Sequence, residues 1–277
     1  MTSTKALFKQ MFLQKRRYAN LVLLIQTFAV IFMLLMGIIF NRNNPINTLS
    51  SGFAGNENIW STILGLGAIT TFFADITFLG LMCWQNEKIN LSQTWQLIPT
   101  SSSKIWLANI LSSLVGCFYV GVIQVVIGLI VLIIDGYSSN INPFGGKFTL
   151  DNSDIVGFAE EILVLVGLCL IIFAFVSFTN LLTRAITDQL PIKNVAAIKL
   201  IVMAVLVIIG IVIAARINDQ VTMMYYNHVL TKTGEFAKVS IDTIGVTALE
   251  YWIGSILLGI IDCLLIQNIV EPKIVNR

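Results

Sequence analysis

Five acidic residues lie in or beside long apolar stretches of this sequence, and they are its first candidates for chemistry. A carboxylate inside hydrocarbon is costly, so each position needs a functional or a structural reason. Two of them, Asp75 and Asp262, lie at similar depth in their stretches and could face one cavity that binds a cation or a proton. The simpler interpretation, which we prefer, is that the carboxylates pair with Lys199, Asn or Ser on neighbouring helices. The five residues are Asp75, Glu160, Glu161, Glu250 and Asp262.

Motifs for catalysis and for metal binding are absent from the sequence. Its one histidine, His228, cannot form a catalytic triad or a multi-histidine metal site within the chain. Neither G-x-S-x-G nor H-E-x-x-H occurs, and Gly145-Gly146-Lys147 lacks the spacing of the phosphate-binding loop G-x-x-x-x-G-K-[ST]. We therefore expect no enzyme, no cofactor and no metal in this chain. Any ATP hydrolysis that drives it must take place on another polypeptide.

The elements that carry the carboxylates are predicted to be transmembrane helices. The sequence is 56% hydrophobic and 12% charged, which is too apolar for a soluble domain. About 20 apolar residues cross a bilayer as a helix, and six stretches reach that length. All five prolines lie between or after these stretches, so each helix is expected to be continuous. The fold class is all-α, a single transmembrane domain over residues 1–277, with spans at about 19–40, 59–84, 105–134, 155–182, 195–215 and 244–269.

The distribution of lysine and arginine predicts the orientation, because cytoplasmic flanks carry an excess of these residues. Of the 17 Lys and Arg residues, twelve lie on the side of the N-terminal tail. The two termini are therefore both predicted to be cytoplasmic in a multi-pass protein of the plasma membrane. The five basic residues on the opposite side are Arg42, Lys147, Arg216, Lys232 and Lys238.

The segment before the first span is predicted to be an amphipathic helix in the membrane interface. In residues 4–18, Leu7 and Met11 lie on one face while Arg16 and Arg17 lie on the other. Lys15 falls on the apolar face and would have to snorkel. A basic flank that is only partly helical is the alternative. Farther along, residues 216–243 are predicted to be the longest outer loop, with Met223 to Tyr226 on the membrane interface or dipping back into it.

The cytoplasmic connection between spans two and three, residues 85–104, is the most informative polar segment. It contains the apolar residues Ile89, Leu91, Trp95, Leu97 and Ile98, and a short helix is expected before Pro99. Ser and Thr at 100–103 are suited to cap the start of span three. Apolar side chains on a cytoplasmic loop favour contact with a partner surface. The alternative is that they sink into the interface beside the two spans.

The arrangement resembles the permease subunits of ABC-2-type ABC exporters. The likeness rests on a basic amphipathic helix before span one, six spans with both ends inside, and a pattern in the loop of residues 85–104. In that loop an acidic-basic pair at the end of span two is followed by an apolar-Pro-Thr/Ser sequence and a lysine that opens span three. The matching residues are Glu87-Lys88, Leu97-Ile98-Pro99-Thr100-Ser101 and Lys104.

The resemblance implies a subunit that forms a homodimer or a heterodimer with a second permease and binds two cytoplasmic ATPases. The ATPase-coupling loop would use Glu87, Lys88, Trp95, Leu97, Pro99 and Lys104, and residues 184–193 would form a second contact. ATP and Mg would lie on the ATPase. A composition rich in Ile, Asn and Lys suggests a bacterial source, in which such exporters carry peptides, drugs or lipid-linked molecules.

Two other classes remain open at this point. A secondary transporter or channel could use Asp75 and Asp262 as cation or proton sites without ATP. Its halves would be expected to show inverted repeats, which the sequence does not display. A membrane scaffold without transport activity is the third possibility.

Overall fold

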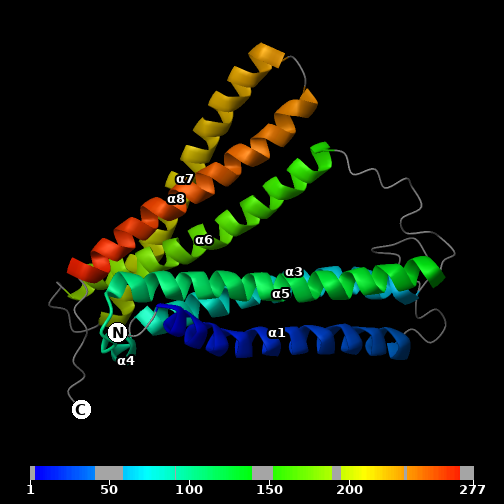
Figure 1. The fold of residues 1–277 in the computed structure, drawn as a ribbon, viewed down its shortest axis with the longest axis horizontal. Coiled ribbons are helices and arrows are strands. Elements are labelled where there is room, and N and C mark those ends of the chain that lie inside the picture. The colour runs from blue at the N-terminus through cyan, green and yellow to red at the C-terminus, as the bar shows by residue number, and fades with distance from the viewer. Residues whose placement is uncertain are drawn as a thin grey trace. The chain divides into compact units, whose positions relative to one another are not determined.

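The computed structural model describes residues 4–40, 59–90, 92–138, 152–188, 195–233 and 236–268. All the secondary structure in these ranges is helical (Figure 1). Six helices are long, and one, α4, is a single turn in the connection between α3 and α5. The elements are α1 (Thr4–Phe40), α3 (Ile59–Asn90), α4 (Gln93–Gln96), α5 (Ser102–Ser138), α6 (Asn152–Asp188), α7 (Val195–Thr233) and α8 (Phe236–Asn268).

Among the described residues, six helices are long and apolar enough to cross a membrane, which confirms the prediction of a multi-pass helical membrane protein. Their large apolar side chains are mostly exposed within the chain. On α7, for example, Leu200, Ile208 and Val212 are each more than half exposed. Such surfaces are unfavourable in water and suited to contact with hydrocarbon.

The helices extend beyond the predicted spans at several ends, and one predicted loop is wrong. Residues 216–243 were expected to form an outer loop, but α7 continues to Thr233 and α8 begins at Phe236. No proline or glycine occurs in the sequence between Arg216 and Thr233, so nothing in the chain ends the helix there. Gly234 follows the last residue of α7, as is typical of helix C-termini. Of the connections predicted to form the first two outer loops, residues 41–58 and 139–151 lie outside the described residues.

The N-terminal helix is present, but it is not a separate element. α1 runs from Thr4 through the first span without a break. Leu7, Met11, Lys15 and Ala19 recur at helical spacing and are buried. Lys15 therefore lies on the apolar face, as predicted, but it is only 1% exposed and does not snorkel.

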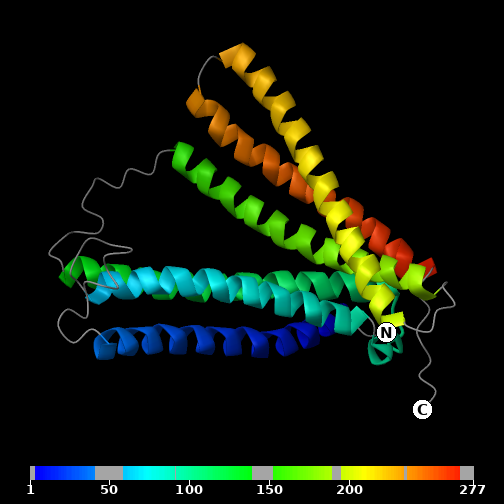
Figure 2. The same ribbon diagram turned by 180° about the vertical axis from the view of Figure 1, so that it is seen from behind.

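The chain divides into two compact units, and α1, α3 and α5 contribute to both. Unit 2 contains α1 from Lys9, α3 up to Met82 and α5 from Val115, and these helices run side by side in Figures 1 and 2. Polar side chains join them. Gln26 Nε2 donates to Thr71 Oγ1 at 2.8 Å, and Gln124 Nε2 donates to Gln26 Oε1 at 3.0 Å.

Unit 1 contains α6, α7 and α8 together with α4, the end of α3 and the start of α5. Its most extensive packing is between α6 and α8, which run in the same direction (Figure 2). A Cβ at Gly167 of α6 would lie 3.0 Å from the Trp252 ring of α8. The absence of a side chain at Gly167 thus lets an aromatic ring lie against the α6 backbone. This close pairing determines which side chains of α6 and α8 meet.

Candidate functional site

The buried face of α8 carries Asp262 into the interior of unit 1. Ala248, Ser255, Gly259, Asp262 and Leu265 follow one another at intervals of three, four or seven residues and are all buried. That spacing is one face of a helix. The other face exposes large apolar residues such as Leu257 and Leu264 to the surroundings. Asp262 is therefore an ionisable group at a core position, with an exposed fraction of 0%.

The end of α3 brings a second buried set of polar residues to the same unit. Gln85, Asn86, Glu87 and Asn90 are all buried, although they were expected to begin a cytoplasmic loop. They belong to the last two turns of α3, which extends to Asn90. The loop is consequently shorter than the sequence suggested, and its predicted first residues are inside the bundle.

Hydrogen bonds connect these α3 residues with α5 and α6. Asn109 Nδ2 donates to the Asn86 carbonyl and to Asn90 Oδ1, both at 3.0 Å. Ser113 Oγ donates to Asn86 Oδ1 at 2.6 Å. Asn90 Nδ2 and Trp106 Nε1 both donate to Ser177 Oγ, at 3.4 and 3.1 Å. We call the group the polar cluster; its members are Asn86, Glu87, Asn90, Trp106, Asn109, Ser113, Ser177, Asn180 and Asp262.

Two carboxylates complete the polar cluster, and they are less well satisfied than its amides. Asn180 Nδ2 donates to Glu87 Oε2 at 2.8 Å, and Arg184, one turn farther along α6, interacts electrostatically with the same carboxylate. Within the described part of the chain, Glu87 Oε1 and both oxygens of Asp262 receive no hydrogen bond. Glu87 and Ser177 lie near enough to Asp262 to interact with it electrostatically. The cluster thus holds two buried acids and few donors for them.

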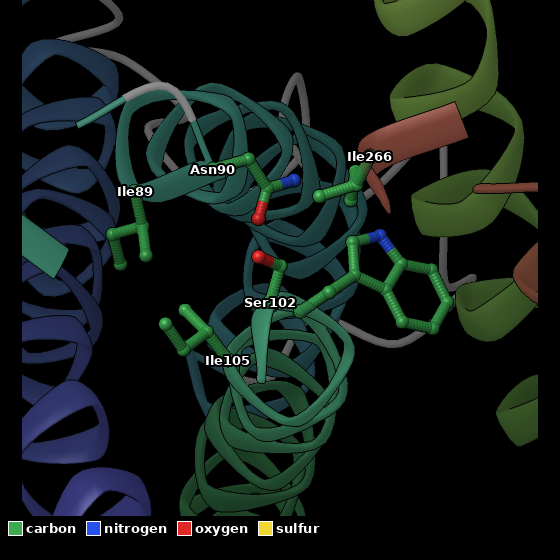
Figure 3. A pocket seen from close by; sticks show the side chains of 6 residues that line it. Ile89, Asn90, Ser102, Ile105 and Ile266 are labelled. Carbon is green, nitrogen blue, oxygen red and sulfur yellow. The ribbon is translucent and has the colours of Figure 1, made fainter. Parts of the chain in front are cut away.

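A small pocket adjoins the polar cluster (Figure 3). Figure 3 shows the side chains of Asn90 and Ser102 pointing toward each other across it. The space is sufficient for roughly one water molecule, which is too small for an organic substrate. The pocket therefore belongs to the polar cluster and is not a candidate substrate site. Its lining residues are Ile89, Asn90, Ser102, Ile105, Trp106 and Ile266.

The connection between α3 and α5 contains the expected short helix, α4, which ends three residues before Pro99. Leu97 is 83% exposed and Trp95 is half-buried. Backbone hydrogen bonds hold the turns on both sides, including Ser92 N to Ile89 O at 3.1 Å. The backbone carbonyl of Ser101 accepts from Lys104 N at 2.9 Å, so the hydrogen bonding of α5 begins at Ser101.

The six residues assigned to the coupling loop differ in their exposure. Lys88, Leu97, Pro99 and Lys104 are exposed, and the Lys88 ammonium lies 5.4 Å from the centre of the Trp84 ring. Glu87 is 7% exposed and faces the polar cluster instead of the loop surface. Of the second predicted contact, residues 184–193, only 184–188 are described, and these form the last turn of α6.

The remaining candidate carboxylates do not join the polar cluster. Asp75 belongs to unit 2, is exposed, and interacts with Gln124, which agrees with pairing to a polar neighbour. Glu161 is exposed. Glu160 and Glu250 are partly exposed, and each has one buried oxygen that accepts no hydrogen bond within the described residues. Within unit 1 Asp262 interacts with Glu87, a residue that the sequence analysis had assigned to the loop.

Several members of the polar cluster were not recognised in the sequence. They occur in pairs three or four residues apart, such as Asn86 with Asn90, Asn109 with Ser113, and Ser177 with Asn180. This spacing places each pair on one face of its helix. Polar pairs at helical spacing, at the cytoplasmic ends predicted for three apolar stretches, are the signal that would have found them.

Comparison with protein-family models, with curated proteins and with solved structures found no match for this chain. Within the described residues, no group of three or more His, Cys, Asp and Glu side chains is placed to hold a metal ion. The class that can be stated is a multi-pass helical membrane protein with a buried polar cluster in unit 1.

Proposed function

We propose that the chain is the membrane subunit of an ATP-binding cassette exporter of the ABC-2 type, and that it binds a separate cytoplasmic ATPase through the loop containing α4. The observation that carries the proposal is the α4 loop itself. A single helical turn, outside the six long helices, presents Leu97 with 83% of its surface exposed. An exposed leucine beside a half-buried tryptophan is a suitable anchor for a protein partner.

The charges around the α4 loop support binding to a protein. Lys88 and Lys104 are exposed on either side of it, and the described residues of the loop, 92–103, include no acidic side chain. A partner with an acidic rim around an apolar pocket would complement this surface. The same two lysines agree with a cytoplasmic position, since basic residues are enriched on that side.

The way in which the loop is attached supports coupling. Asn86 and Asn90 at the end of α3 are hydrogen-bonded to Asn109 of α5, so the two helix ends that enter and leave the loop are tied together. Gln267 Nε2 of α8 donates to Ser103 Oγ at the start of α5, at 2.5 Å. A partner that moves α4 would therefore also move the ends of α3, α5 and α8, to which the loop is attached.

In this proposal the chain supplies the translocation pathway as one half of a homodimer or heterodimer. ATP and Mg bind to the ATPase, and the substrate is a peptide, a drug or a lipid-linked molecule. The protein lies in the plasma membrane of a bacterium with both termini in the cytoplasm. This orientation is supported by the distribution of its 17 Lys and Arg residues.

The proposal is tested by purifying the tagged chain from its native membrane in mild detergent. We expect a cytoplasmic ATPase to copurify, and we expect ATP to drive solute export from vesicles that contain both. If no ATPase is recovered, and the purified chain moves solute under an ion gradient alone, the exporter proposal is wrong. A secondary transporter would then be the better interpretation.

A further inference from the structure

We propose that Asp262 and Glu87 form a proton-binding pair, in which one proton is held between α8 and α3 inside unit 1. The pair consists of two buried carboxylates from different helices that interact with each other electrostatically. The proposal concerns the purified chain by itself and does not depend on the ATPase partner.

The first argument is burial with few donors. Asp262 is 0% and Glu87 is 7% exposed, and three of their four oxygens receive no hydrogen bond from the described residues. An ionised carboxylate in such a place loses its hydration without replacement, which costs much more than burying a neutral acid. Two like charges at this site would add repulsion. One proton shared by the pair removes most of the cost of lost hydration and most of the repulsion.

The second argument comes from the hydroxyl of Ser177. Its oxygen already accepts hydrogen bonds from Asn90 Nδ2 and Trp106 Nε1. A serine oxygen has two lone pairs, so its remaining capacity is that of a donor. The Ser177 hydroxyl interacts with both Asp262 and Glu87. It can therefore donate to an acid, but it has no lone pair left for a metal cation.

The number of ligands that a metal ion needs favours a proton over a metal ion at this pair. Hard cations such as Ca²⁺ and Mg²⁺ take about six or more oxygen ligands, whereas only three carboxylate oxygens of the pair lack hydrogen bonds. A proton requires only one acceptor besides the atom that carries it. On Asp262 it creates an O–H donor, and Glu87 Oε1 is an acceptor without a donor. Bound in this way, the proton satisfies one oxygen on each residue.

The charged and titratable groups around the pair agree with a single proton. α6 contributes Arg184, which interacts with Glu87, and α3 contributes Cys83. α8 contributes Cys263, while α5 contributes the uncharged Trp106. Lys88, the nearest basic residue in sequence, instead lies over Trp84. Arg184 can balance an ionised Glu87, and the proton then belongs on Asp262.

The pair is positioned to link proton binding with the α4 loop. Glu87 lies one turn before the end of α3, and α4 begins at Gln93. A proton shared with Asp262 holds this end of α3 against α8, whereas its loss leaves two repelling carboxylates at the contact. We therefore expect release of the proton to loosen the attachment of the loop.

The test is infrared difference spectroscopy of the purified protein in lipid, recorded between mildly acidic and mildly alkaline pH. We expect a carbonyl band from a protonated carboxylic acid in wild type that shifts when the aspartates carry ¹³C in their side-chain carboxyl groups. The band should be missing from Asp262→Asn and unchanged in Glu161→Gln, which alters an exposed carboxylate. The labelled wild type keeps the test valid even if Asp262→Asn fails to fold. A band that does not shift with the label, or that persists in a folded Asp262→Asn, would overturn the proposal.

A second measurement uses the thermal unfolding temperature as a function of pH. If the folded state holds a proton that the unfolded chain releases, stability is lost as pH rises. We expect the unfolding temperature of wild type to fall toward alkaline pH, and that of Asp262→Asn to depend less on pH. Replacing choline chloride by sodium chloride should not stabilise wild type. Sodium stabilisation that Asp262→Asn abolishes would show that the pair binds a metal cation, and the proton proposal would be wrong.

Discussion

Asn109 connects α5 with two points on α3, and it uses both hydrogens of its amide to do so. It is fully buried, and the two α3 residues to which it donates, Asn86 and Asn90, are also buried. Inside a membrane such an amide stabilises the fold, because the acceptors that lose its hydrogen bonds have no water to bind instead. Single residues in the polar cluster should therefore have measurable effects on stability.

We predict that Asn109→Leu, which keeps the approximate shape of the side chain, destabilises the protein by about 1–3 kcal/mol, since it leaves the Asn86 carbonyl and Asn90 Oδ1 without this donor. The matched control is Thr77→Val. Thr77 is exposed and its hydroxyl donates only to the Phe73 carbonyl of its own helix. Thermal unfolding of the purified variants in detergent measures the difference. Equal stability of the two variants would contradict the assigned role of Asn109.

At the scale of the helix, the contact between α8 and α5 depends on a glycine of α8 that lets a side chain of α5 lie close to its backbone. A Cβ at Gly259 would lie 2.9 Å from the indole ring of Trp106, a distance that requires the ring to move. The Trp106 indole N–H is the donor to Ser177, so movement of the ring would also disturb the polar cluster. Gly259 thus connects the packing of two helices with the hydrogen bonding of a third.

We predict that Gly259→Ala destabilises the protein by about 1–3 kcal/mol, because it overpacks the contact with Trp106. Gly157→Ala on α6 is the control. Nothing lies within 4 Å of a Cβ at Gly157, so the gain in helix propensity should leave stability unchanged or slightly higher. The measurement is the unfolding midpoint in detergent. If both alanines behave alike, the α8–α5 contact is not as tight as the structure indicates.

The α4 loop provides the second prediction at this scale, and it rests on the exporter proposal. We predict that Trp95→Ala weakens binding of the ATPase by about 1–3 kcal/mol, which is typical of a partly buried aromatic anchor. The variant should insert and accumulate normally, because its change lies outside the six long helices. Pull-down with titrated ATPase measures the affinity.

Tyr137→Ala is the control for that experiment. Tyr137 is 86% exposed and lies near the end of α5 that is remote from α4. The Tyr137→Ala variant should bind the ATPase as tightly as wild type does. Normal binding by Trp95→Ala would indicate that the loop does not dock in the proposed way.

At the scale of the whole molecule, the helices expose apolar surfaces that are suited to contact with lipid. Exposed leucine, isoleucine, valine and phenylalanine cover most of α1, α5 and α7, while the buried positions of unit 1 are enriched in Asn, Ser and Thr. Helix association in a membrane depends on such polar contacts and on small residues, because lipid tails are as apolar as the side chains. The polar cluster is thus a structural element of unit 1 as well as a candidate site.

The orientation of the molecule is open to a direct test. The excess of basic residues on one side predicts that single cysteines at Asn44, Ser139 and Lys232 react with an impermeant thiol reagent in intact cells. Cysteines at Gln93 and Asp188 should react only after the membrane is opened. The background is a variant without the four natural cysteines. Labelling of position 93 from outside would reverse the predicted topology.

The sequence by itself determined that the chain is helical and how many times it crosses the membrane. Runs of about 20 apolar residues have one stable conformation in hydrocarbon, because only a helix satisfies every backbone group locally. It also predicted the short helix before Pro99, since the helix end follows from local backbone chemistry. The sequence analysis ended α3 and α7 too early and began α8 too late. Gly234 was a signal for the end of α7 that we did not use.

The tertiary structure decided which polar groups meet. The sequence paired Asp262 with Asp75 because depth in the membrane can be counted along a helix. It could not give the rotation of each helix or its neighbours, which depend on contacts such as that of Gly167 with Trp252. In unit 1 Asp262 interacts electrostatically with Glu87, and Asp75 instead interacts with Gln124 in unit 2. Glu87, which the sequence analysis had placed in a loop, is thus the neighbour of a buried acid. The packing of α6 against α8 determines which side chains lie beside Asp262.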